Sequence, residues 1–112
     1  MKQGDVIMVN LSPIKGREQA GYRPAVVISR TKYNNKRDFA MVCPITSQTR
    51  PRNFRVRLDG RTHTKGDIIC EHVKTIDLLA REHKVVESLP ADLLAQVLRA
   101  VSFIISMDDA ES

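Results

Sequence analysis

The spacing of apolar residues changes once along this chain, after segment 84–87. Before that point apolar residues stand in short runs separated by turn-forming residues, whereas from Pro90 onward they recur at intervals of three and four. Pro90 near the first helical position and Asp92 in the first turn favour a helix start there. The spacing therefore predicts one amphipathic C-terminal helix that packs on a sheet. Its apolar positions are Leu93, Leu94, Val97, Leu98, Val101, Ile104 and Ile105.

Short apolar segments before that helix have the composition of β-strands. They are residues 5–11, 25–29, 39–43, 54–58, 68–73 and 84–87. The run 25–29 is apolar almost throughout, which indicates a central strand buried on both faces. We expect Pro44 to interrupt and bend the third strand, cluster 34–38 to be a polar turn, and segment 74–79 to be a turn or a single helical turn.

These elements predict a mainly β fold. So few short strands cannot form two independent sandwich layers, so we expect a small, strongly bent antiparallel sheet that closes toward a barrel and carries the terminal helix. The length of 112 residues fits one domain over 1–112. Residues 108–112 are expected to fray, because acidic side chains oppose the negative end of a helix dipole.

The composition restricts the core and the compartment. Aromatic residues make up only 4% of the chain and tryptophan is absent, so the core must be aliphatic. No apolar run approaches the roughly 18 residues that a membrane span needs, and the first residues do not form a signal peptide. We therefore expect a cytoplasmic protein without a membrane segment.

The two cysteines have no spacing typical of a metal site. Cys43 and Cys70 each stand alone in an apolar segment, without a Cys-x-x-Cys pair or metal-ligand spacing to a histidine. We expect buried free thiols, no disulfide and no metal site.

Positive charge is concentrated in the middle of the chain. The formal net charge of +5 favours an anionic partner such as nucleic acid. The concentrated residues are Arg50, Arg52, Arg55, Arg57 and Arg61, with Lys65 just beyond. The alternation Arg55-Val56-Arg57-Leu58 places guanidinium groups on one face of a strand. A nucleic-acid track and an ordinary solvated sheet face both fit this pattern.

A glycine-punctuated loop precedes the apolar run 25–29. It contains Glu18 and Arg23 between Gly16 and Pro24, and Pro24 restricts the backbone at the entry to the strand. A carboxylate and a guanidinium held together there can act on one anion as a base and a cation. Charged loop residues are also common as ordinary solvated groups, so the loop alone leaves both interpretations open.

Four segments, in this order, carry a resemblance to a known family. They are Gly4-Asp5-Val6, residues 16–24 (GREQAGYRP), residues 44–47 (PITS) and residues 71–77 (EHVKTID). Together they resemble the MazF/PemK toxins, a family of sequence-specific endoribonucleases, over nearly the whole chain. The resemblance implies an SH3-like barrel, a homodimer, cleavage of single-stranded RNA without metal or other cofactor, and a cognate antitoxin that silences the toxin.

The resemblance also implies roles for individual residues. Metal-free RNA cleavage needs a base for the ribose 2′-hydroxyl, stabilisation of the phosphoryl charge, and a proton for the 5′-oxygen. We expect Arg23 to stabilise phosphate charge, because a guanidinium matches two phosphate oxygens and keeps its charge. Thr46 is expected to donate to a phosphate oxygen or to position the nucleophile, and Glu18 to act as the base or to orient Arg23.

Further residues are expected to bind RNA. Gln19 and Tyr22 flank the catalytic loop, Tyr22 with an aromatic ring that can stack on a base or pack on the barrel. Ser47 is expected to share the work of Thr46. The basic residues of the track are Arg50, Arg52, Arg55 and Arg57. His72 stands where relatives often carry glutamine, and we expect it to be a strand residue, with participation in proton transfer as the alternative.

Two other functions remain as alternatives. CcdB toxins resemble this family in fold and act on gyrase by protein contact, but they use a C-terminal tryptophan motif, and this chain has no tryptophan. A non-catalytic RNA-binding barrel fits the basic stretch and does not require Glu18, Arg23 and Thr46 together.

Overall fold

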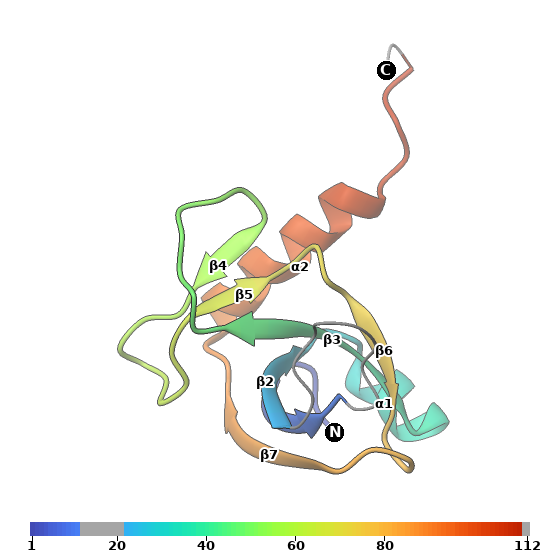
Figure 1. The fold of residues 1–112 in the computed structure, drawn as a ribbon. Helices are drawn as coiled ribbons and strands as arrows, with labels where there is room; N and C mark the ends of the chain where they lie inside the picture. The colour runs from blue at the N-terminus through green and yellow to red at the C-terminus, as the bar shows by residue number, and fades with distance from the viewer. Residues whose placement is uncertain (12–21, 111–112) are drawn as a thin grey trace.

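The computed structural model describes residues 1–11 and 22–110 (Figure 1). In this part of the chain it contains seven strands and two helices. The strands are β1 (Asp5–Asn10), β2 (Tyr22–Val27), β3 (Phe39–Thr46), β4 (Arg55–Arg57), β5 (Asp67–Ile69), β6 (Lys74–Asp77) and β7 (His83–Ser88). The helices are α1 (Thr31–Arg37) and α2 (Ala91–Ile105).

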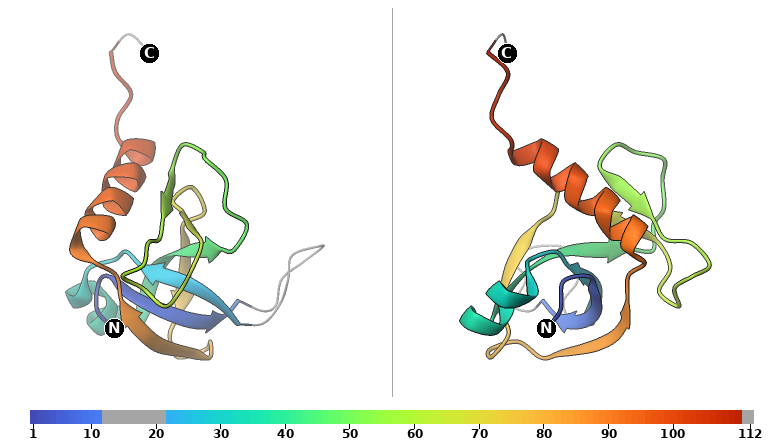
Figure 2. Two further views of the ribbon diagram at one scale, coloured as in Figure 1. Left: turned by 90° about the vertical axis from the view of Figure 1, so that its left-hand side faces the viewer. Right: turned by 180° about the vertical axis from the view of Figure 1, so that it is seen from behind.

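The strands form one bent antiparallel sheet with the order β4-β5-β3-β2-β1-β7, and β6 pairs with the first half of β3. The order begins at β4 and ends at β7, so the sheet does not close on itself. Figures 1 and 2 show that it curves strongly. The predicted mainly β class, the bent antiparallel sheet and the C-terminal helix are confirmed.

Two apolar clusters lie on opposite faces of the central strands. Val26 of β2 joins the cluster that α2 covers, whereas Ala25 and Val27 join a second cluster. All three side chains are fully buried. The continuous apolar run therefore forms a central strand buried on both faces, as the sequence predicts, although β2 begins three residues earlier, at Tyr22.

The helix α2 starts where the sequence predicts. Pro90 is its N-cap, and Leu93, Val97 and Val101 are buried at four-residue intervals against the sheet. The predicted apolar face continues further than the packing does, because Ile105 is 74% exposed. Beyond α2 the chain extends away from the sheet (Figure 2).

The prediction that Pro44 interrupts the third strand is wrong, because β3 runs through Pro44 to Thr46. On one edge of β3 the partner is β6 up to Val42 and β5 from Ile45 onward. Pro44 lies between these two ladders, where a missing backbone N–H breaks no pairing on that edge. On the other edge β2 still pairs opposite Pro44.

Two segments predicted as turns are regular elements. Residues 31–37 form α1, whose inward contact is polar: the buried Asn34 amide donates to the carbonyls of Ser29 (3.1 Å) and Met1 (3.2 Å). Residues 74–77 form β6, in which only Ile76 is buried. Neither element shows an apolar period, so tertiary contacts rather than the local pattern determine them.

Cys43 and Cys70 are free and buried, as predicted. Burial of the two thiols raises their pKa values, that of Cys43 to about 12 and that of Cys70 to about 11. Such thiols stay protonated and unreactive at neutral pH.

Neither of the helices that the structure describes is long and apolar enough to cross a bilayer.

Candidate functional site

The ends of four neighbouring strands bring the candidate residues together. Thr46 at the end of β3 pairs with Asp67 of β5, and Asp67 pairs with Arg57 of β4. On the other side of β3, the pairing with β2 runs from Val27↔Val42 to Ala25↔Pro44, and Arg23 and Thr46 each lie two residues beyond its last pair. Directly opposed residues of an antiparallel ladder share a face. Thr46, Asp67 and Arg57 therefore form a cross-strand row, and Arg23 follows the end of the β2–β3 ladder on the other side of Thr46.

Arg23 is the second residue of β2 and is half-buried. Within residues 1–11 and 22–110, its guanidinium has no hydrogen bond or ion pair. The backbone around it is rigid, because Arg23 pairs with Val9 of β1 and precedes Pro24 in the same ladder. The described part of the fold thus fixes the backbone of Arg23 without neutralising the charge of its side chain.

Thr46 is the last residue of β3, three residues beyond the predicted end of that strand. Its Oγ1 accepts a hydrogen bond from the backbone N–H of Gln48 at 3.1 Å, which closes a small turn after β3. Because the hydroxyl is an acceptor in this contact, its own proton remains available for donation. Ser47 follows directly and is exposed. The hydroxyl of Thr46 can therefore donate to an anion bound beside Arg23.

Asp67 is the residue of this row that the sequence analysis missed. Its side chain is 1% exposed, and it accepts hydrogen bonds from the backbone N–H of Arg50 (3.0 Å), from Nη1 of Arg55 (3.3 Å) and from Nε of Arg57. Burial raises the pKa of this carboxyl, but the bonds from Arg57, Arg50 and Arg55 outweigh burial and hold the pKa below its ordinary value. A signal existed in the sequence: an acidic residue opens an apolar strand beside an arginine-rich stretch.

The two arginines of β4 lie on one face, as the alternation predicts, but their exposure differs. Arg55 has a side chain only 13% exposed and also donates to the carbonyl of Gln48 at 2.9 Å. Arg57 has a side chain 54% exposed. Arg50 and Arg52 are exposed in the connection between β3 and β4. Of these four arginines, Arg55 is mostly enclosed by the fold, whereas Arg50, Arg52 and Arg57 reach solvent.

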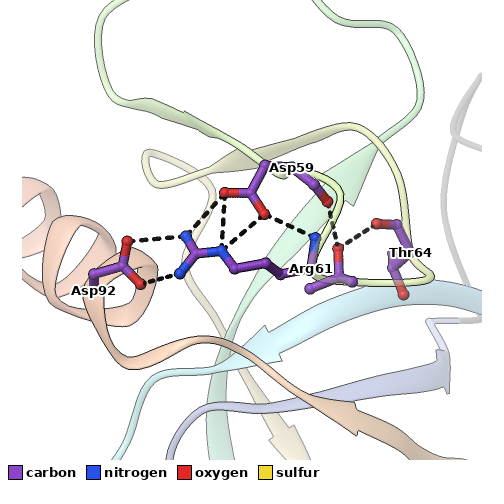
Figure 3. A network of polar contacts seen from close by, with 5 residues as sticks. Asp59, Arg61, Thr64 and Asp92 are labelled. Carbon is purple, nitrogen blue, oxygen red and sulfur yellow. Dashed lines mark hydrogen bonds and ion pairs between the residues drawn. The ribbon is translucent and has the colours of Figure 1, made fainter.

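The last arginine of the stretch belongs to a separate network (Figure 3). The Arg61 guanidinium binds the carboxylates of Asp59 and Asp92, each at 2.8 Å at its shortest, and so links the loop after β4 to the first turn of α2. Hydrogen bonds from Arg61 lower the pKa of Asp59 to about 2. Next to it, the Thr62 hydroxyl donates to the carbonyl of Thr64 at 2.7 Å. Arg61 thus stabilises this loop.

Tyr22 lies at the start of β2 and is 48% exposed. Its hydroxyl donates to the carboxylate of Glu82, and this bond raises the pKa of Tyr22. Tyr22 and Arg23 are successive strand residues, so their side chains point to opposite faces of the sheet. Contact of Tyr22 with an RNA base stays a prediction.

The remaining predicted residues have different outcomes. Glu18 and Gln19 lie outside the described residues. The expectation that His72 is a strand residue is wrong: His72 is exposed in the turn between β5 and β6, and its backbone N–H donates to the carbonyl of Ile69 at 3.2 Å. The strand predicted at 68–73 ends early at Ile69, because the turn follows directly. In the described part of the chain, no three His, Cys, Asp or Glu side chains are grouped so as to hold a metal ion.

Comparison with known proteins gives the family. Residues 2–105 match the family of PemK-like, MazF-like toxins of type II toxin-antitoxin systems. The endoribonuclease PemK of Escherichia coli is 34% identical over 110 residues, covering 95% of this chain and 83% of PemK. The endoribonuclease toxin MazF of Escherichia coli K12 is 44% identical over 78 residues, covering 70% of this chain and 69% of MazF.

Solved structures agree with this result. The crystal structure of MazF from Deinococcus radiodurans superimposes with a TM-score of 0.86 at 30% identity, covering 96% of this chain and 97% of that one. MazF in a MazE–MazF crystal structure of the same organism gives the same TM-score, 0.86, at 30% identity. The chain therefore belongs to the PemK-like, MazF-like toxin family.

Proposed function

We propose that this chain is a sequence-specific endoribonuclease toxin that cleaves single-stranded mRNA in the cytoplasm, without a metal or other cofactor, and thereby inhibits translation and growth. The observation that carries this proposal is the placement of Thr46 and of Arg23, which has no ion-pair partner among the described residues, just beyond the last pair of the β2–β3 ladder. Membership in a toxin family whose relatives PemK and MazF are named endoribonucleases supports it.

The proposed reaction uses the RNA's own nucleophile. The ribose 2′-oxygen bonds to the adjacent phosphorus as the bond from phosphorus to the 5′-oxygen breaks, which gives a 2′,3′-cyclic phosphate and a 5′-hydroxyl. A base accepts the 2′-hydroxyl proton, and an acid protonates the departing 5′-oxygen. DNA lacks the 2′-hydroxyl and is expected to stay intact.

Arg23 and Thr46 are assigned to the phosphoryl group. The guanidinium of Arg23 stabilises the charge that gathers on the phosphoryl oxygens, because it remains protonated throughout the reaction. The Thr46 hydroxyl donates to one of these oxygens. Glu18 is proposed as the base or as the group that orients Arg23, and Gln19, Tyr22, Ser47, Arg50, Arg52 and Arg57 as RNA-binding residues. Arg55, also expected from the sequence to bind RNA, is instead engaged by Asp67 and by the Gln48 carbonyl.

A homodimer and a cognate antitoxin complete the proposal. A MazE–MazF complex has been crystallised from Deinococcus radiodurans, and its MazF chain has the fold described above. We propose that this chain binds a corresponding antitoxin, and that an acidic or amphipathic disordered segment of the antitoxin competes with RNA for the exposed arginines. One domain over residues 1–112 is proposed as the active unit.

Cleavage of a long defined RNA in excess chelator tests the proposed function. Purified protein is expected to make discrete cuts with 5′-hydroxyl ends, and Arg23→Ala to abolish them. Arg99→Ala, which removes an exposed arginine of α2, is the matched control and should cut normally. Intact RNA together with stalled gyrase would support the CcdB-like alternative, and bound but uncut RNA would support a non-catalytic RNA-binding barrel.

A further inference from the structure

Asp67 lies at the centre of contacts that all come from the chain immediately after Thr46. Its donors are the backbone N–H of Arg50 and the side chains of Arg55 and Arg57. Arg55 in turn donates to the carbonyl of Gln48. The buried carboxylate of Asp67 therefore connects three segments through hydrogen bonds: the turn after β3, the connection to β4, and β4 itself.

The same carboxylate leaves one of its arginines available to solvent. Arg57 donates from Nε to Asp67, and its side chain is 54% exposed. Within the described residues its terminal nitrogens have no partner, so they can bind an anion. Arg55 is 13% exposed and divides Nη1 between Asp67 and Gln48. A guanidinium held through Nε keeps its other N–H groups in a fixed direction.

The register gives the distance between Arg57 and the candidate site. Thr46, Asp67 and Arg57 are opposed on three adjacent strands, β3, β5 and β4. Because neighbouring strands lie about 4.8 Å apart, the backbones at Thr46 and Arg57 are about 10 Å apart. That interval suits a phosphate next to the one that reacts.

We propose that Asp67 is a positioning residue that orients Arg57 toward a phosphate of the bound RNA, adjacent to the phosphate held by Arg23 and Thr46. This inference rests on the proposed endoribonuclease function. It separates the two arginines of β4: Arg57 contacts RNA, and Arg55 holds the loop.

The direction in which RNA affinity changes when the Asp67 carboxylate is removed distinguishes this role from simple electrostatics. A carboxylate beside the RNA path repels phosphate, so its removal should tighten RNA binding if charge alone matters. If Asp67 orients Arg57, its removal should weaken RNA binding even though the protein becomes more positive. Asp59 provides the control, because it is also paired with an arginine but belongs to the Arg61 network.

Steady-state kinetics on a short RNA that spans one mapped cut tests this inference. Asp67→Asn keeps the side-chain shape but replaces one of the two acceptor oxygens with an NH2 donor, so it cannot accept on both sides, and it is expected to raise KM about tenfold with a smaller change in kcat. Arg57→Gln should raise KM similarly. The double variant Asp67→Asn/Arg57→Gln should be no worse than either single variant, because both remove the same contact. Asp59→Asn should leave KM unchanged or lower it.

An unchanged or lower KM for Asp67→Asn, or additive effects in the double variant, would overturn the inference while the unchanged protein still cuts RNA. If Asp67→Asn does not fold, Arg57→Gln and Arg55→Gln decide: a higher KM only for Arg57→Gln supports the inference, and a normal KM for Arg57→Gln overturns it. Absence of cleavage by the unchanged protein would overturn the proposed function and this inference together.

Discussion

Gly66 lies directly behind the carbonyl group of Thr46. A Cβ placed on Gly66 would be 2.0 Å from the Thr46 oxygen and 2.9 Å from its carbonyl carbon, and Gly66 has a φ of +124°. Both the space and the backbone conformation at this position exclude a side chain. The backbone at the end of β3, where Thr46 lies, therefore packs against a residue that must be glycine.

Replacing Gly66 with alanine is expected to displace Thr46. We expect Gly66→Ala to lower the free energy of unfolding by about 2 kcal/mol, because strain and the backbone clash add. Cleavage should fall more than the folded fraction does. Gly60→Ala is the matched control, because a Cβ at Gly60 meets nothing within 4 Å. Urea unfolding and cleavage rates measure both effects, and equal behaviour of the two variants would contradict this view of Gly66.

The hydroxyl of Thr46 is expected to matter more for catalysis than for stability. Thr46→Val removes the acceptor for the Gln48 N–H and the donor for phosphate, so unfolding should become easier by about 1 kcal/mol and kcat should fall about 100-fold. Thr46→Ser retains the hydroxyl and should keep most activity. Single-turnover cleavage with saturating enzyme isolates this step. A Thr46→Val variant with normal turnover would remove Thr46 from the mechanism.

The sequence predicts those elements whose stability depends on their own apolar pattern. The continuous run at β2 and the helical spacing of α2 lead directly to buried strands and a buried helix face. By contrast, α1 depends on the buried amide of Asn34, and β6 depends on pairing with β3. The bond from Asn34 to Met1 and the β3–β6 pairing join residues more than 30 apart in the sequence, so no local pattern reveals them.

The same limit applies to the candidate site. Alternation correctly places Arg55 and Arg57 on one face of β4, whereas β3 ends at Thr46, three residues beyond the predicted strand 39–43. The partner of both arginines, Asp67, follows only from the β4–β5 register, which places residues 57 and 67 opposite each other. Without that register the basic stretch is indistinguishable from a uniform row of exposed arginines. The structure shows that Arg55 is mostly enclosed, whereas Arg57 is exposed.

Arg50 and Arg52 are expected to determine much of the salt dependence of RNA binding. Each phosphate contact with single-stranded RNA contributes about 0.7 to the log–log slope of affinity against salt. The double variant Arg50→Gln/Arg52→Gln should therefore reduce that slope by up to about 1.4. Lys32→Gln/Lys36→Gln on α1 is the control of equal charge, because α1 leads into the start of β3, opposite the Thr46 end. Equal slopes for the two double variants would exclude these arginines from the RNA path.

Acid is expected to destabilise the protein through its paired carboxylates. Arginine partners lower the pKa of Asp59 from 3.8 to about 2 and also lower that of Asp92, while hydrogen bonds from Thr64 lower that of Glu87 against the effect of burial. A carboxylate whose pKa is lower in the folded state stabilises the fold above the unfolded pKa and loses this contribution as pH falls through the folded value. Urea midpoints should therefore be constant from pH 7 to about 5 and decline between about pH 4 and 2. Arg61→Gln should flatten that decline by releasing Asp59 and Asp92, whereas an unaltered decline would show that these exposed pairs contribute nothing measurable.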